Sequence, residues 1–224
     1  MQPEMNTPES RPRDDLPVLE STRIRLRGFR EDDLGDFYAV HSDPVVNRYW
    51  SFPAWTDPAQ ARDYFASALA GRDAGRMLCW AVADRGDDRL IGATTLAAID
   101  RAQARAEIGY ALRSSHWGHG YAREAVRLAL DHAFGALGLR RIEADIDPRN
   151  TGSCRLVERL GFVREGLLRA LAGRRRGHRF GDLRAAGARV ARRPPRLTNR
   201  QARIIPGLSG SSERPGHSGL LGST

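Results

Sequence analysis

The hydrophobic and polar positions of the first half of the chain change period several times. Residues 22–27 alternate apolar and charged side chains, which is typical of a strand with one buried face. Residues 31–41 begin with acidic side chains and then place apolar side chains three and four positions apart. This pattern predicts a helix. A Thr-Asp-Pro start predicts a second helix, over 56–71. Three strands, which we expect to form an antiparallel meander, follow at 77–83, 90–99 and 106–112.

The second half begins with the strongest helical pattern of the chain. Apolar residues line one face from Gly120 to Gly135. A strand over 141–147, a short helix over 151–160 and a last strand over 162–168 are expected next. These elements predict an α/β (α+β) domain, in which helices pack against a mixed but mostly antiparallel sheet.

Length and composition indicate one globular domain with terminal extensions. The 224 residues are 41% hydrophobic and 28% charged, and no apolar run approaches the roughly 20 residues that span a bilayer. We expect a polar leader over 1–17, the domain over 18–169 and a tail over 170–224. The leader lacks the pattern of a signal peptide, and we expect both cysteines to be reduced thiols, so the sequence predicts a cytoplasmic protein without membrane attachment.

The charge of the chain is concentrated in its tail. Residues 169–224 hold 13 basic and 2 acidic residues, a net charge of +11, whereas the remainder carries −2. All 36 basic residues are arginine, which indicates GC-rich coding DNA. The tail has no sustained period, so it is either a disordered basic extension or a frameshifted reading of an ordinary C-terminus. Nucleic-acid or ribosome binding is expected only through this tail, which lacks stacking aromatics and a recognition motif.

The most informative motif is the glycine-containing loop Trp117–Ala122, between an expected strand and the long helix. Free backbone N–H groups at a helix start, together with the helix dipole, bind anions such as phosphate. By itself the motif is more often only a turn before a helix. His116 and His119 have no accompanying ligands, so we expect no metal.

A second stretch, Asn150–Phe162, also follows an expected strand and faces the same end of the sheet. With the glycine loop, it resembles the GNAT superfamily of N-acetyltransferases, and specifically the RimJ/RimL-like branch, over Leu19–Arg169. The other motifs that carry the resemblance are 22–27, Ile91-Gly92, Glu107–Tyr110 and Gly120–Ala125.

This resemblance implies acetyl-CoA as cosubstrate. The glycine loop would cradle its pyrophosphate, and the strands 106–112 and 141–147 would splay apart to admit the pantetheine arm. Trp117 departs from the Gln or Arg common in the superfamily, so its side chain should not carry affinity. The implied cosubstrate-binding residues are Tyr110, Ala111, Leu112, Trp117, Gly118, His119, Gly120, Tyr121, Ala122, Asn150 and Ser153.

The resemblance further implies direct attack of an amine on the thioester. The acceptor would be a protein N-terminal amine or a small-molecule amine, and the protein a monomer or homodimer. Glu107 would take the amine proton through water, and Ser153 or Tyr121 would protonate the departing thiolate. Alternatives without a catalytic role stay open. Glu107 would then be an outward-facing strand residue and Ser153 a hydroxyl at a helix start. The whole chain would then be a GNAT-like protein without activity.

Overall fold

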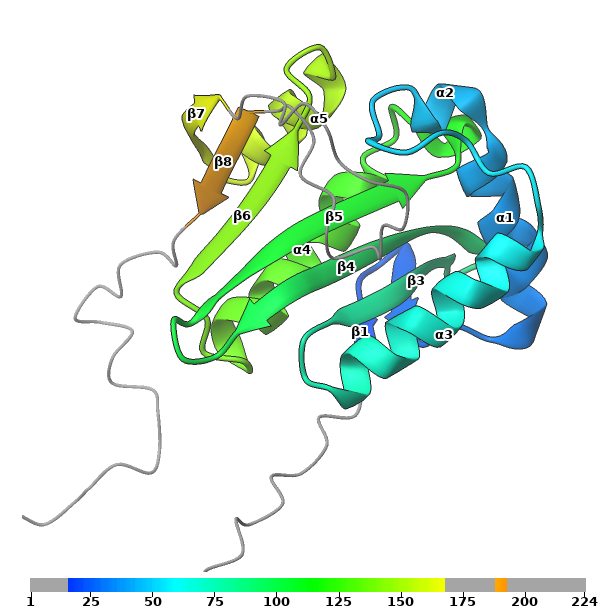
Figure 1. The fold of residues 1–224 in the computed structure, drawn as a ribbon, viewed down its shortest axis with the longest axis horizontal. Coiled ribbons are helices and arrows are strands. Elements are labelled where there is room, and N and C mark those ends of the chain that lie inside the picture. The colour runs from blue at the N-terminus through cyan, green and yellow to red at the C-terminus, as the bar shows by residue number, and fades with distance from the viewer. Residues whose placement is uncertain (1–15, 168–187, 193–224) are drawn as a thin grey trace, which may run out of the picture. The chain divides into compact units, whose positions relative to one another are not determined.

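The computed structural model describes residues 16–167 and 188–192, and within these ranges one eight-stranded sheet carries helices on both faces (Figure 1). Neighbouring strands are antiparallel, except for the parallel pair β5–β6. The order across the sheet is β1-β2-β3-β4-β5-β6-β8-β7. The strands are β1 Leu19–Glu20, β2 Ile24–Arg27, β3 Leu78–Asp84, β4 Leu90–Asp100, β5 Arg105–Leu112, β6 Arg141–Ile146, β7 Val163–Leu167 and β8 Ala188–Arg192.

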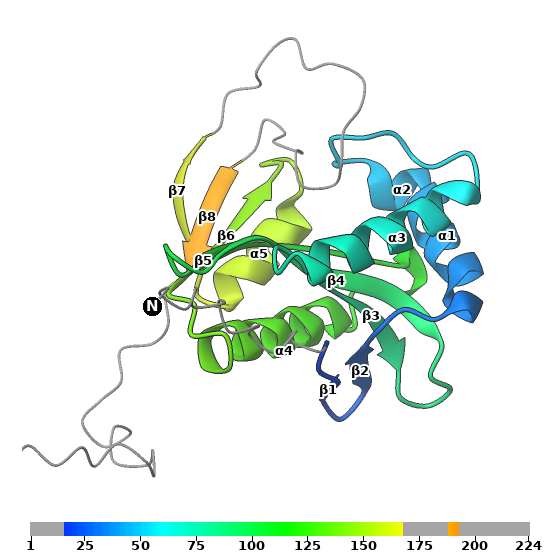
Figure 2. The same ribbon diagram turned by 60° about the horizontal axis from the view of Figure 1, so that its bottom comes forward.

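The helices divide between the two faces of the sheet. Figure 2 shows α3 and α4 on opposite sides of the strands. One hydrophobic cluster joins α4 and α5 to the sheet, and a second, rich in aromatic rings, joins α1 and α3 to the other face. Among the residues described, no helix is long and apolar enough to cross a membrane. The helices are α1 Leu34–Ser42, α2 Pro44–Asn47, α3 Ala59–Asp73, α4 Tyr121–Gly135 and α5 Thr151–Arg159.

The elements expected between residues 22 and 168 are present, with bounds that shift by a few residues. The short helix α2 was not predicted: the dipeptide Asp43-Pro44 after the helix expected over 31–41 indicates only that this helix ends. In the structure the Asp43 carboxylate accepts a hydrogen bond from the Val45 N–H at 2.8 Å, and Pro44 occupies the first helical position. The same dipeptide therefore ends one helix and begins the next.

The sheet extends beyond the expected domain boundary at residue 169. Ala188–Arg192 forms β8, which lies between β6 and β7 and pairs antiparallel with both. The expectation of no regular structure after Arg169 is wrong for this segment, because strand pairing is made by backbone groups and does not require an apolar side-chain pattern. Residues 1–15 of the leader expected over 1–17, and the disordered or frameshifted character proposed for the rest of the tail, lie outside the described residues.

A buried ion pair fixes the entry into α1. The Arg27 guanidinium donates to both carboxylate oxygens of Asp33, at 2.7 and 2.9 Å, and both side chains are about 95% buried. Arg27 also donates to the backbone oxygen of Asp88, while Asp33 accepts from the Arg30 N–H. The pair therefore holds β2, the start of α1 and the β3–β4 turn together.

Removing one member of this pair should destabilise the domain strongly. Asp33→Ala would remove the two short hydrogen bonds of the buried Arg27 and leave only its longer ion pair with the Asp88 carboxylate, at 3.4 Å, and we expect it to cost about 3–5 kcal/mol in urea unfolding. Glu31→Ala is the matched control, because its partner Arg62 and Glu31 itself are both largely exposed. That control should cost at most about 1 kcal/mol. Equal losses for the two variants would contradict the structural role given to the pair.

Candidate active site

A cleft of about 810 Å³ lies at the carboxyl ends of β5 and β6. These strands pair only over three residues, from Arg105↔Arg141 to Glu107↔Glu143, although β5 continues to Leu112 and β6 to Ile146. The expected splayed strand pair is therefore confirmed. The cleft is lined by residues of α2, the end of β5, the loop and first turn of α4, and the first turns of α5.

The glycine loop closes one side of the cleft, where it was predicted to lie. Gly118 and Gly120 have φ angles of 81° and 85°, a left-handed conformation that favours glycine. Gly120 is the N-cap of α4, so the first N–H groups of a 15-residue helix face this loop. The Trp117 indole N–H donates to the Leu112 carbonyl at 2.8 Å, which ties the loop to the end of β5.

Arg23, near the N-terminus, holds the glycine loop in place, and this role was not predicted from the sequence. Arg23 donates to the His119 carbonyl at 3.0 Å and to the Glu124 carboxylate at 2.6 and 2.9 Å, and its guanidinium lies 4.6 Å from the centre of the Tyr121 ring. Burial would raise the pKa of Glu124, but hydrogen bonds from Ser21 and Arg23 hold that pKa below its ordinary value. The contact spans about a hundred residues, so no local pattern could reveal it.

The second predicted motif forms the opposite wall. Asn150 is the N-cap of α5, and its carboxamide oxygen accepts from the Ser153 N–H at 3.1 Å. The Tyr110 hydroxyl reaches from β5 and donates to the Ser153 carbonyl at 3.5 Å. Burial raises the pKa of Tyr110 to about 12, so this hydroxyl stays neutral. Both motifs therefore face one cleft, as expected.

The three candidate catalytic residues do not all meet there. Tyr121 and Ser153 line the cleft, as do all the other residues expected to bind the cosubstrate. Glu107 does not line it. Its neighbours Ala106 and Ile108 lie in the core under α4, so Glu107 is on the opposite face of the sheet, half-buried and in register with Glu143.

The lining of the cleft is basic. Arginine side chains come from the residue after α2, from the first turn of α4, from the loop before α5 and from α5 itself, and the lining residues that the structure describes include no Asp or Glu. Because residues 1–168 carry a net charge of −2, the positive cleft is produced by the arrangement of charges rather than by composition. These arginines are Arg48, Arg123, Arg149, Arg155 and Arg159. In the described part of the chain, no three His, Cys, Asp or Glu side chains gather in a way that could hold a metal ion.

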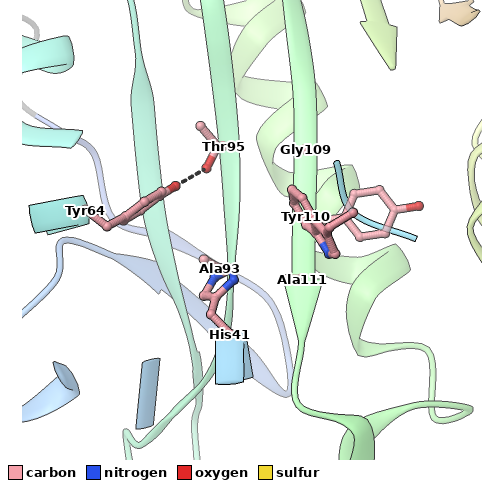
Figure 3. Close-up of a pocket in the computed structure, with 8 residues that line it drawn as sticks. His41, Tyr64, Ala93, Thr95, Gly109, Tyr110 and Ala111 are labelled. Atoms are coloured by element: carbon pink, nitrogen blue, oxygen red, sulfur yellow. Dashed lines mark hydrogen bonds between the residues drawn. The ribbon is translucent and has the colours of Figure 1, made fainter. Parts of the chain in front are cut away.

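A second, small cavity lies against the sheet on the side of α1 and α3 (Figure 3). Its lining shares Trp50, Tyr110 and Ala111 with the cleft. The two hollows therefore meet at the same residues of β5.

Comparisons with known proteins agree with this geometry. The sequence profile of the acetyltransferase (GNAT) domain matches residues 23–163. The uncharacterized N-acetyltransferase p20 of Bacillus licheniformis is 37% identical over 154 residues, 69% of this chain and 86% of that protein. Spermidine N(1)-acetyltransferase of Vibrio cholerae is 24% identical over 148 residues, 66% of this chain and 83% of that protein.

A solved structure of RimJ from Mycobacterium smegmatis, in complex with CoA-disulfide, has a similar fold. Its TM-score is 0.61 at 27% sequence identity, and the match covers 76% of this chain and 81% of that protein.

Filling the glycine loop should abolish CoA binding. Gly120→Val would strain a backbone with φ of 85° and crowd the anion-binding N–H groups, and we expect no measurable CoA affinity by isothermal titration. Gly138→Val is the matched control: φ there is 64°, and the site follows the far end of α4. This control should lose stability but keep its CoA affinity. Unchanged affinity in Gly120→Val would show that the pyrophosphate binds elsewhere.

Proposed function

The chain belongs to the GNAT acetyltransferase family, and we propose that it transfers the acetyl group of acetyl-CoA to a primary amine, either a small-molecule amine or the N-terminal amine of a protein. The observation that carries this proposal is the glycine loop at the start of α4, which opens on the gap between β5 and β6 inside a basic cleft.

The cosubstrate fits the cleft through three features. The N–H groups of Gly118–Ala122 would hold the pyrophosphate at the start of α4. Arg123, Arg155 and Arg159 line the same mouth and would attract the phosphates. The gap beyond Glu107↔Glu143 would take the pantetheine arm, which brings the thioester to the end of β5.

Backbone groups of β5 are placed to stabilise the oxyanion of the attack. The Arg113 N–H donates to Ile91 in β4, and backbone groups alternate in direction along an antiparallel pair. The N–H groups of Tyr110 and Leu112 therefore point away from β4, toward the gap, where β6 has no residue in register with them. A donor aimed at the developing negative charge typically contributes a large part of acyl-transfer catalysis.

Side chains near the gap would move the protons. The Ser153 hydroxyl and the Tyr121 hydroxyl line the cleft and would donate to the departing thiolate. Glu107 lies outside the cleft lining, on the same strand face as Gly109, which lines the small cavity. It would therefore accept the amine proton only through water that enters from that face.

Acetyl transfer by the purified protein is the direct test of this function. We expect thiol release from acetyl-CoA that depends on an added amine, with the N-acetylated product detected by mass spectrometry. The acceptor panel should include polyamines, amino sugars and N-terminal peptides. Gly120→Val serves as the matched inactive control. CoA binding without transfer to any amine would instead support a GNAT-like protein that has lost its activity.

The role of Glu107 has a characteristic pH dependence. A base is needed most when the amine is protonated, and the reference pKa is about 8 for an α-amine and about 10.4 for a lysine-like amine. We expect Glu107→Gln to lower kcat more at acidic than at alkaline pH, since neutral amine becomes abundant as pH rises. The distant Glu31→Gln should leave the profile unchanged. A loss of equal size at every pH would indicate positioning rather than proton removal.

A further inference from the structure

The small cavity beside the cleft is formed by α1, α3, the central strands and Trp50. Its walls are His41 of α1, Tyr64 of α3, Ala93 and Thr95 of β4, and 109–111 of β5, together with Trp50. Figure 3 shows the imidazole of His41 rising from α1 toward the strands, between the Tyr64 side and the Tyr110 side. Because Trp50, Tyr110 and Ala111 also line the cleft, a group in this cavity would lie next to the end of β5.

His41 brings an unsatisfied polar atom to this place. The residue is 98% buried, and among the described residues its Nδ1 has no hydrogen-bond partner. The ring is held by aromatic neighbours: it stacks on Trp55 with centroids 4.5 Å apart and meets the edge of Phe37 at 4.6 Å. A buried nitrogen without a partner costs free energy, so a group that supplies a hydrogen bond there would be favoured.

The Tyr64 and Thr95 hydroxyls of the cavity wall are engaged with each other and with the neighbouring Cys79 thiol. The Cys79 thiol and the Thr95 hydroxyl are 2.9 Å apart, and the Tyr64 hydroxyl lies 3.2 Å from Cys79 and 3.4 Å from Thr95. Burial raises the pKa of the Cys79 thiol to about 11, so this trio is neutral. His41 is therefore the wall residue with a polar atom, Nδ1, left to bond an incoming ligand.

The size of the cavity restricts what could enter. Its volume of about 10 Å³ is enough for one water-sized group. Gly109 helps to form this space: a Cβ added there would meet no atom within 4 Å. An amino group on an unbranched carbon fits such a volume, whereas a branched or larger head group does not.

We propose that this cavity receives the reacting amino group of the acceptor, a primary amine on an unbranched methylene, and that His41 Nδ1 accepts a hydrogen bond from its N–H. The assignment rests on the proposed acetyl transfer. Burial lowers the pKa of His41 to about 4, so the imidazole is neutral near pH 7, and the tautomer protonated at Nε2 has a lone pair on Nδ1 that can accept this hydrogen bond. The alternative occupant, the methyl group of the acetyl moiety, would leave that nitrogen unsatisfied.

The test compares His41→Phe with wild-type protein, using a primary amine that the wild type acetylates. Phenylalanine keeps the ring among its aromatic neighbours but removes Nδ1. We expect the KM for the amine to rise about tenfold, the effect of one lost hydrogen bond, while the KM for acetyl-CoA stays unchanged. Titration of the amine into CoA-saturated protein should show the same loss. His41→Asn, whose amide lies close to the position of Nδ1, should recover part of the amine affinity.

Two further variants separate binding from folding. Val40→Ala removes a fully buried neighbour on α1 that does not line the cavity, so it should lower Tm without changing the KM for the amine. Gly109→Ala places a methyl group in the cavity from the side of β5. It should weaken amine binding, and it can be measured even if His41→Phe does not fold.

The outcomes distinguish this assignment from the proposed function. An unchanged amine KM in both His41→Phe and Gly109→Ala would overturn the assignment while leaving acetyl transfer intact. A changed preference between acetyl-CoA and propionyl-CoA, with an unchanged amine KM, would assign the cavity to the acyl methyl group instead. Wild-type protein that binds CoA but acetylates no amine would overturn the proposed function, and the assignment with it.

Discussion

The end of the β5–β6 pairing is the constraint on which the candidate site depends. Once the two parallel strands separate after Glu107↔Glu143, the backbone of β5 between Ile108 and Leu112 has no residue of β6 in register with it. Buried backbone groups require partners, and side chains supply part of the compensation. The Trp117 indole satisfies the Leu112 carbonyl, and the Tyr110 hydroxyl crosses to α5. The gap is thus held open by specific contacts while the N–H groups facing it stay available to a substrate.

The glycine loop shows how conformational freedom and restraint are combined at this gap. Gly118 and Gly120 allow left-handed backbone conformations that turn N–H groups toward the cleft, but glycine also increases the entropy lost on ordering. Arg23 reduces the remaining freedom by bonding the loop carbonyl of His119 and the carboxylate of Glu124. A loop ordered before binding loses less entropy when the ligand arrives.

The two faces of β5 separate the two substrates of the proposed reaction. The end of this strand contributes to the basic cleft, and Gly109–Ala111 also borders the aromatic cavity that holds His41. The phosphates of the cosubstrate would therefore approach β5 through the basic cleft, and the acceptor amine would approach it through the aromatic cavity. The acidic Glu107 lies on the face of the cavity, away from the phosphates that the arginines would attract in the proposed reaction.

The sequence by itself determined the elements between residues 22 and 168, because helix and strand periods are local properties of side-chain burial. It also located both loops of the cleft, since glycine at a helix start and an Asn cap have local causes. It could not find β8, Ala188–Arg192, which is identified by its backbone pairing with β6 and β7, nor α2, which begins at a dipeptide that also ends a helix. Only the tertiary structure brought Arg23 to the glycine loop, turned Glu107 away from the cleft and buried His41 Nδ1 without a hydrogen-bond partner among the described residues. Those features depend on strand order and side-chain packing between segments far apart in the chain, for which a local pattern carries no information.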